Sequence, residues 1–344
     1  MCSMPEATND RSAAAHAVAQ RHSRGSLTLG IVAAVALVAP LRLSAIPLKD
    51  VTTAVAMTLA VLGVNLMAGF VGRVALGHGA FVGTGAYTAV ILSADHHWPM
   101  LATIPAAAAV GFLVGIVVGL PALRIRGLHL ALVTLAVGAA FGPIVKRLDT
   151  LTNGPNGKTS KASWVAPTWL GESRDANGRW GYLTVLAVAL VVFALVRNIT
   201  NGRVGRSLVA LRDGEIAALT SGVNVRRYSV AVFGCSAAVA AIAGALLMIE
   251  TPFAATSSFE SSLSLYLYAA ATVGGLASIS GAVIGGVILV GVPYLTAKFD
   301  ITIDQRVIFG LALIAAVTLF PAGISSIFHG RRFGGRTAAY SSGP

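Results

Sequence analysis

The sequence predicts an all-α, polytopic integral membrane protein with about ten transmembrane helices and with both termini in the cytoplasm. Of its 344 residues, 56% are hydrophobic and only 11% are charged, and the mean hydropathy is +0.79. A chain with so little polar surface cannot cover a soluble globule. The apolar residues also form runs of a length that can cross a bilayer, which takes about 20 residues at about 1.5 Å each.

Ten apolar runs predict the spans, and short polar connections separate them. The third run and the two runs around residue 279 are rich in glycine, so each of them could be a full span or a broken, re-entrant helix. The predicted spans are 27–43, 51–70, 76–93, 100–120, 128–148, 181–197, 229–250, 263–278, 281–297 and 304–322.

The distribution of Lys and Arg predicts the topology. The net charge of +12 comes from residues in short connections and tails, which indicates membrane orientation and not nucleic-acid binding. With the N-terminus inside, most Lys and Arg fall on the cytoplasmic side. We therefore expect a cytoplasmic N-terminal tail (1–25) that leads into an uncleaved anchor, a transmembrane domain (26–328) and a cytoplasmic C-terminal tail (329–344).

The largest predicted cytoplasmic connection, residues 198–228, contains the pattern of a short helix. Asp213 can cap an N-terminus, Glu215 complements the helix dipole in the first turn, and Gly222 suits a left-handed C-terminal cap. The segment GEIAALTS then makes about two turns, too short to persist alone in water. We expect it to pack against a partner, although a solvated loop whose arginines only fix topology explains the local sequence equally well.

Small residues are expected to let that partner approach closely, and the candidates are Ala217, Ala218 and Ser221. The segment GEIAALTSGVNVRRY resembles the EAA loop of ABC importer permeases, in which a Glu and small residues precede a Gly. The blocks NLMAGFVGRVALGHGAFVGTGAYTAV, PALRIRGLHLALVTLAVG and ATVGGLASISGAVIGG resemble, in the same order, permeases of branched-chain amino acid ABC importers of the M-subunit type. The resemblance covers roughly residues 50–322.

The resemblance implies a transport subunit in the bacterial inner membrane, not an enzyme. It would work with a second permease subunit, two ATP-binding subunits and a soluble periplasmic or extracellular substrate-binding protein, and no nucleic acid. Asp213, Glu215, Ala217, Ala218 and Gly222 would then couple the permease to an ATPase subunit. The substrate would be leucine, isoleucine or valine, although other amino acids, urea or amides are open, as is the choice between a heterodimer and a homodimer of permeases.

This chain is expected to hold no cofactor or metal ion, and ATP would bind the partner subunits. The segment TNGPNGKTS (152–160) suggests a phosphate loop, but a Walker A motif requires Gly where Thr152 stands. It therefore predicts a turn cluster of Asn, Gly and Pro on the outer side. Two adjacent histidines, His96 and His97, lack the further ligands that a metal site needs.

Glycines at helical spacing predict close helix packing. G-x-x-x-G pairs let two backbones approach where lipid supplies no hydrophobic drive, and packing on small residues also lets helices slide during gating. The pairs are Gly79 and Gly83, Gly115 and Gly119, and Gly281 and Gly285.

Polar residues inside the spans are candidates for a substrate path. They are Asn65, Thr84, Tyr87 and Thr88, and for each of them an interhelical hydrogen bond is the simpler role. The spans contain no run of ionisable residues that would suit a proton relay, which disfavours the alternative of an ion-coupled secondary transporter or channel for a small neutral solute. A membrane-embedded enzyme would need a nucleophile with a neighbouring base, and the sequence shows no such pair.

Overall fold

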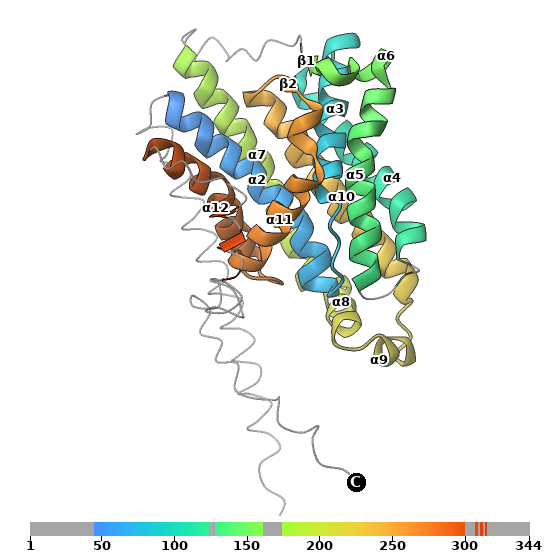
Figure 1. Cartoon of the computed structure of the whole chain (residues 1–344). Helices are drawn as coiled ribbons and strands as arrows, with labels where there is room; N and C mark the ends of the chain where they lie inside the picture. The colour runs from blue at the N-terminus through green and yellow to red at the C-terminus, as the bar shows by residue number, and fades with distance from the viewer. Residues whose placement is uncertain are drawn as a thin grey trace, which may run out of the picture.

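The computed structural model describes residues 45–123, 125, 128–160, 174–299, 307–308, 310–311 and 314. Long helices lie side by side, with two short helices, α8 and α9, at one end and two short strands at the other (Figure 1). The elements are α2 (Ala45–Asn65), the π-helix η1 (Leu66–Val71), α3 (His78–Asp95), α4 (Met100–Ala122), α5 (Leu128–Arg147), α6 (Asp149–Thr152), η2 (Gly154–Asn156), β1 (Lys158–Thr159), α7 (Arg174–Asn201), α8 (Arg203–Asp213), α9 (Glu215–Thr220), α10 (Val225–Glu250), β2 (Phe253–Ala254), η4 (Thr256–Phe259), α11 (Ser261–Gly274) and α12 (Ile279–Lys298).

Six helices in the described part of the chain are long and apolar enough to cross a membrane. The spans are Leu48–Val71, Met100–Ala122, His129–Arg147, Ala176–Asn201, Val225–Glu250 and Ile279–Lys298. The chain is therefore a mostly helical, polytopic membrane protein, as its composition predicts.

The core lies around α10, which packs against α2, α3 and α4, while α12 covers another side of α2. Aromatic rings fill the centre: Phe81 of α3 meets Phe233 of α10 edge to face, with ring centroids 5.7 Å apart. Most side chains of α3 are buried. Protein neighbours therefore shelter this 18-residue helix, which is not one of the six candidate spans.

The run 263–278 contains a short helix and not a full span, which is one of the two alternatives that its sequence leaves open. The helix found there, α11, has only 14 residues, about 21 Å of rise against a hydrocarbon core of about 30 Å. Gly275, whose φ is +117°, ends the helix before the predicted boundary. The predicted spans 27–43 and most of 304–322 lie outside the described residues, so the number of ten helices and the side of each terminus stay predictions.

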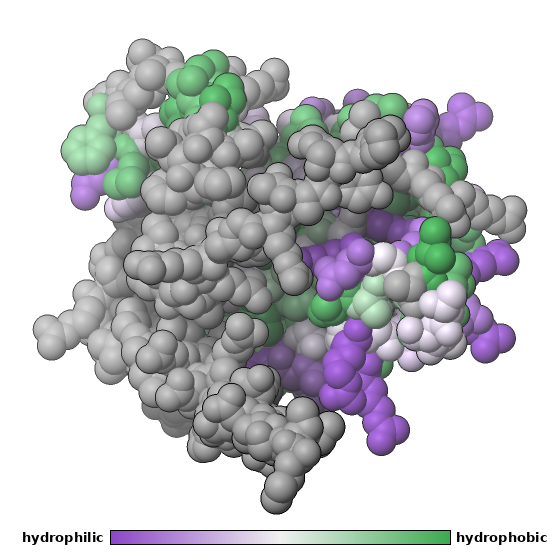
Figure 2. Space-filling model, turned by 90° about the horizontal axis from the view of Figure 1, so that it is seen from below, coloured by the Kyte–Doolittle hydropathy of each residue, from purple (hydrophilic) through white to green (hydrophobic). Residues whose placement is uncertain are grey.

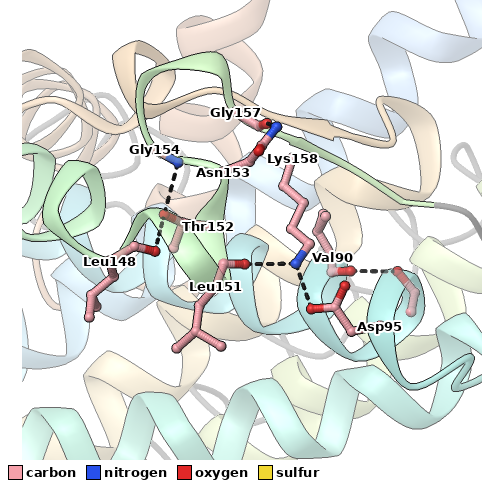
Figure 3. A network of polar contacts seen from close by, with 10 residues as sticks. Val90, Asp95, Leu148, Leu151, Thr152, Asn153, Gly154, Gly157 and Lys158 are labelled. Atoms are coloured by element: carbon pink, nitrogen blue, oxygen red, sulfur yellow. Dashed lines mark hydrogen bonds and ion pairs between the residues drawn. The ribbon is translucent and has the colours of Figure 1, made fainter.

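At the end opposite α8 and α9, the segment 152–160 forms the expected turn cluster. Asn153, Gly154 and Gly157 all have positive φ angles, and β1 pairs antiparallel with β2 in the register Lys158 to Ala254. Figure 3 shows Lys158 donating from Nζ to the Asp95 carboxylate at 2.5 Å and to the Leu151 carbonyl at 2.7 Å. The lysine thus joins the end of α3 to the segment after α5 and does not face a phosphate cradle.

Candidate functional site

The end of the bundle that carries α8 and α9 combines charged and apolar surface. Figure 2, which looks at this end, shows hydrophilic residues (purple) beside hydrophobic ones (green) where the surface is coloured. In α8, Leu208 and Leu211 are buried, whereas Arg203 and Arg206 are exposed. The helix therefore lies with one face against the bundle and its basic face outward.

The short helix α9 is closed by the cap that its sequence predicts. Gly222 has φ +79°, its amide donates to the Leu219 carbonyl at 3.0 Å, and the Val223 amide donates to the Ala218 carbonyl at 3.0 Å. This pair of bonds is the Schellman motif, which satisfies the last carbonyls of a helix. Open space surrounds the position of a Cβ at Gly222, so the constraint there comes from the backbone angle alone.

The two faces of α9 differ in burial. Ala218 is completely buried against the bundle, while Ile216 is 80% exposed and Leu219 is 53% exposed. Ile216 and Leu219 are three residues apart and thus share one side of the helix. A helix of six residues with two large apolar side chains in solvent presents a surface that a partner can cover.

Glu215 at the start of α9 is connected to the bundle through Arg73. An Arg73 Nη2 atom lies 3.5 Å from Glu215 Oε2, and Nη1 donates to the Leu123 carbonyl at 3.4 Å. Arg73 thereby joins α9 to the end of α4.

A cleft of about 490 Å³ lies beside the Arg73–Glu215 contact and is lined in part by Leu219 and Ser229. The buried Ser229 hydroxyl has no hydrogen-bond partner among the described residues.

Two expectations about this segment need correction. Asp213 does not cap α9: it is the last residue of α8, and Gly214 separates it from α9. Its carboxylate lies 3.7 Å from Arg212 Nε and accepts no backbone hydrogen bond among the described residues.

The small residues in and just after α9 do not all face outward as expected. Ala218 faces the bundle, while Ser221 is exposed and the side chain of Ala217 lies outside what the structure describes. Sequence reasoning missed Ile216 and Leu219, although their spacing on a short helix signals an apolar face.

The three glycine pairs all lie at helix contacts. A Cβ at Gly79 would come within 2.8 Å of Ser264 Oγ, and one at Gly83 within 2.5 Å of the Phe141 ring. Gly115 and Gly119 face α10, and Gly281 and Gly285 face backbone oxygens of Gly275 and Ala270 respectively. These positions suit tight packing, and their part in gating stays a prediction.

The four candidate substrate-path residues occupy different environments. Asn65 is fully buried and its amide bonds the turn between α11 and α12. Tyr87 is buried, with its hydroxyl 3.1 Å from Thr256 Oγ1. Thr84 and Thr88 are partly exposed one turn apart on α3, and their hydroxyls bond carbonyls of their own helix. Asn65 and Tyr87 thus bond residues of other segments, whereas the hydroxyls of Thr84 and Thr88 bond within α3.

No group of three or more metal-ligating side chains occurs in the described part of the chain. Nor is any Asp, Glu, Lys or Arg among its buried residues, where the polar side chains are Thr, Ser, Asn and His. The bundle interior is thus polar without being charged.

Comparison with known proteins agrees with this picture. A family model described as a permease component of branched-chain amino acid transport systems matches residues 46–318. The chain is 30% identical over 248 residues to the high-affinity branched-chain amino acid transport system permease proteins LivM of Salmonella typhimurium and Escherichia coli, a match that covers 67% of this chain and 58% of each relative. It thus spans less than two thirds of their length.

A second set of relatives matches over more of its own length. The permease protein LivH of the same kind of system in Escherichia coli is 26% identical over 301 residues, covering 80% of this chain and 93% of the relative. No solved structure matches the chain significantly. Because the family model covers most of the chain, from the first turn of α2 to beyond the end of α12, this protein belongs to the branched-chain amino acid transport permease family.

Proposed function

We propose that the chain is a permease subunit of an ATP-driven importer in a bacterial plasma membrane, where it forms part of the path for branched-chain or related neutral amino acids. Residues 26–328 make the transmembrane domain, with about ten helices, and the tails 1–25 and 329–344 lie in the cytoplasm together with α8 and α9. Family membership and the apolar spans support this proposal.

The observation that carries the coupling role is the exposed apolar face of α9. Its inner side is fixed by buried Ala218, by the Gly222 cap and by the ion pair of Glu215 with Arg73. Its outer side presents Ile216 and Leu219. Full burial of such side chains is worth about 1.5–3 kcal/mol each. A cleft in an ATP-binding subunit that accepts Ile216 and Leu219 would therefore bind α9 more tightly and move together with it.

The partners follow from the single coupling helix, α9, that we identify in the described part of the chain. Two ATP-binding subunits need two such helices, so a second permease is required. The relatives include both LivM and LivH permease proteins of high-affinity branched-chain amino acid transport systems, which favours a heterodimer. A soluble substrate-binding protein outside the membrane completes the importer, and ATP binds to the partner subunits.

The uncharged interior supports the substrate class. The buried polar residues of the described chain are neutral, so a strongly charged solute would find no counter-ion among them. A zwitterionic amino acid carries no net charge, and its apolar side chain suits apolar helix surfaces. Branched-chain amino acids are the substrates that the names of the relatives give.

The test is a pull-down of the tagged chain from its native cells, with identification of co-purifying proteins by mass spectrometry. Wild type is expected to bring down two ATP-binding subunits and a second permease. Ile216→Glu puts a charge on the docking face, and we expect at least a tenfold loss of the ATP-binding subunits while the chain stays in the membrane.

Gly222 supplies a matched pair of variants for the same experiment. Asn tolerates the left-handed conformation, whereas Val does not, so Gly222→Asn should retain the ATP-binding subunits and leucine uptake, and Gly222→Val should lose most of both. Equal recovery from Ile216→Glu, Gly222→Val and wild type would overturn the docking role. Uptake that survives ATP depletion but fails when the proton gradient is collapsed would overturn the ATP-driven class.

A further inference from the structure

The π-helix η1 lies between the α8–α9 segment and the turn that joins α11 to α12. It continues α2 for six residues and ends at Gly72, whose φ is +76° and whose amide bonds the Met67 carbonyl. The Arg73 amide reaches the same carbonyl at 3.2 Å. Single π-helical turns are rare and occur frequently at functional sites, which makes the contacts of this one informative.

On one side, η1 is held by the last turn of α8. Arg212 Nη1 donates to the Gly69 carbonyl at 3.3 Å. A Cβ at Gly72 would lie 2.8 Å from Arg212 Cγ, so the arginine stem rests directly on the end of η1. A shift of α8 therefore reaches η1 through both a polar and a packing contact.

On the other side, η1 is held by Asn65, the residue that precedes it. Asn65 Nδ2 donates to the Ser278 carbonyl at 2.7 Å and to the Gly275 carbonyl at 3.4 Å, and Oδ1 accepts from the Ala277 amide at 2.7 Å. The amide side chain thus spans the whole turn. Ala277 has φ +58°, a left-handed conformation that disfavours side chains, and the Asn65 contact satisfies its amide there.

Gly69 is where the two sides meet. Its carbonyl accepts from Arg212, while a Cβ on it would overlap both Asn65 Oδ1 and the Ala277 amide. A single residue without a side chain therefore contacts Arg212 of α8 on one side and the α11–α12 turn on the other. Arg212, Gly69 and the α11–α12 turn are therefore in close contact, so that a shift of one of them displaces the next.

We propose that η1 is the joint that transmits movement of the coupling segment to the α11–α12 turn, with Arg212 and Asn65 as its two positioning residues. The inference rests on the proposed function and adds the route inside this chain. The turn ends a 14-residue helix that is too short to cross the bilayer. Gly274 and Gly275 are buried where this helix ends, so displacement of the turn changes the packing inside the bundle.

The test uses the complete complex of permeases, ATP-binding subunits and binding protein in proteoliposomes. Asn65→Leu keeps the branched side chain of four heavy atoms but removes all three bonds, and Arg212→Met keeps the stem but removes the bond to Gly69. Matched controls are Thr103→Val, which removes a buried hydroxyl that bonds within its own helix, and Arg206→Met, which removes an exposed charge from α8.

The main readout is the number of leucine molecules imported per ATP hydrolysed. For Asn65→Leu and Arg212→Met we expect this ratio to fall at least fivefold while the ATP-binding subunits remain bound in normal amount, and we expect both controls to keep it. A purely structural defect lowers the amount of complex and leaves the ratio unchanged, which would overturn the joint. A wild-type complex that imports nothing with ATP would overturn the proposed function and the joint with it.

Distances between spin labels give a second readout. Labels at Val209 and Leu276, each paired with one at Leu113, use three exposed positions on α8, on the turn and on α4. In wild type both distances should change when ATP is trapped. In Asn65→Leu the Val209 distance should still change and the Leu276 distance should not; a persistent change at Leu276 would show that the turn moves without the joint.

Discussion

Helices α4 and α10 have the same mean hydropathy of 2.3 in their most apolar stretch, yet 28% of that stretch is buried in α4 and 83% in α10. Apolar composition therefore shows that a helix enters the bilayer but not whether protein or lipid surrounds it. The difference in burial between α4 and α10 follows the positions of their small residues, at which neighbouring helices approach closely. Gly111, Gly115 and Gly119 form one stripe on α4 that faces α10, whereas α10 has small residues against several neighbours.

The largest effect is expected where α10 meets α3 in the centre. A Cβ at Gly244 would overlap the Val82 carbonyl oxygen, and backbone on both sides cannot yield as a flexible side chain can. Gly244→Val should reduce the amount of folded protein in the membrane at least tenfold. Size-exclusion chromatography of the detergent-solubilised chain measures this, and a monodisperse peak of normal height would show that the central packing tolerates a side chain.

An intermediate effect is expected on α4, which has protein on one side only. A Cβ at Gly115 would lie 2.6 Å from Ala237 Cβ and 3.0 Å from Gly234 Cα, but α4 can shift outward to make room. Gly115→Val should accumulate normally and lose about 1–3 kcal/mol of stability, the usual cost of overpacking. A thermal-shift measurement that finds Tm unchanged would mean that the α4–α10 contact is looser than its glycine stripe indicates.

The smallest effect is expected at Gly291 of α12, where a Cβ would meet no other atom of the described chain within 4 Å. Gly291→Val should leave both the amount and the Tm of the isolated chain unchanged. The same variant sharpens the comparison when it is measured in the assembled importer. A loss of assembly there, with a stable isolated chain, would identify this face of α12 as a contact with the second permease and not with lipid.

The sequence predicted the helical membrane class and most span positions within a few residues, because hydropathy and length are local properties. It did not predict the end of α11 at Gly274 or the π-helix after Asn65. Both depend on tertiary contacts: the Asn65 amide bonds backbone atoms more than 200 positions away. No local pattern around Asn65 indicates such partners.

For the candidate site, Gly222 has the conformation that its residue type suggests, whereas Asp213 does not occupy the capping position that its type suggests. Gly222 takes the left-handed angle, a position where other side chains are strained. Asp213 suits a helix N-terminus in general, but here it is the last residue of α8. The spacing of Ile216 and Leu219 signals an apolar face, but the burial of Ala218 and the exposure of Ile216 depend on which side of α9 meets the bundle, which no local pattern gives.

The pairing of β1 with β2 has a mechanical consequence for α10. This helix starts at Val225, close behind α9, and ends at Glu250, three residues before β2, where the register of Lys158 with Ala254 fixes the chain. The strand pair therefore ties the Glu250 end of α10 to the segment that follows α5. Sliding of α10 along its axis would pull this pair apart, whereas tilting of its Val225 end leaves the pair intact.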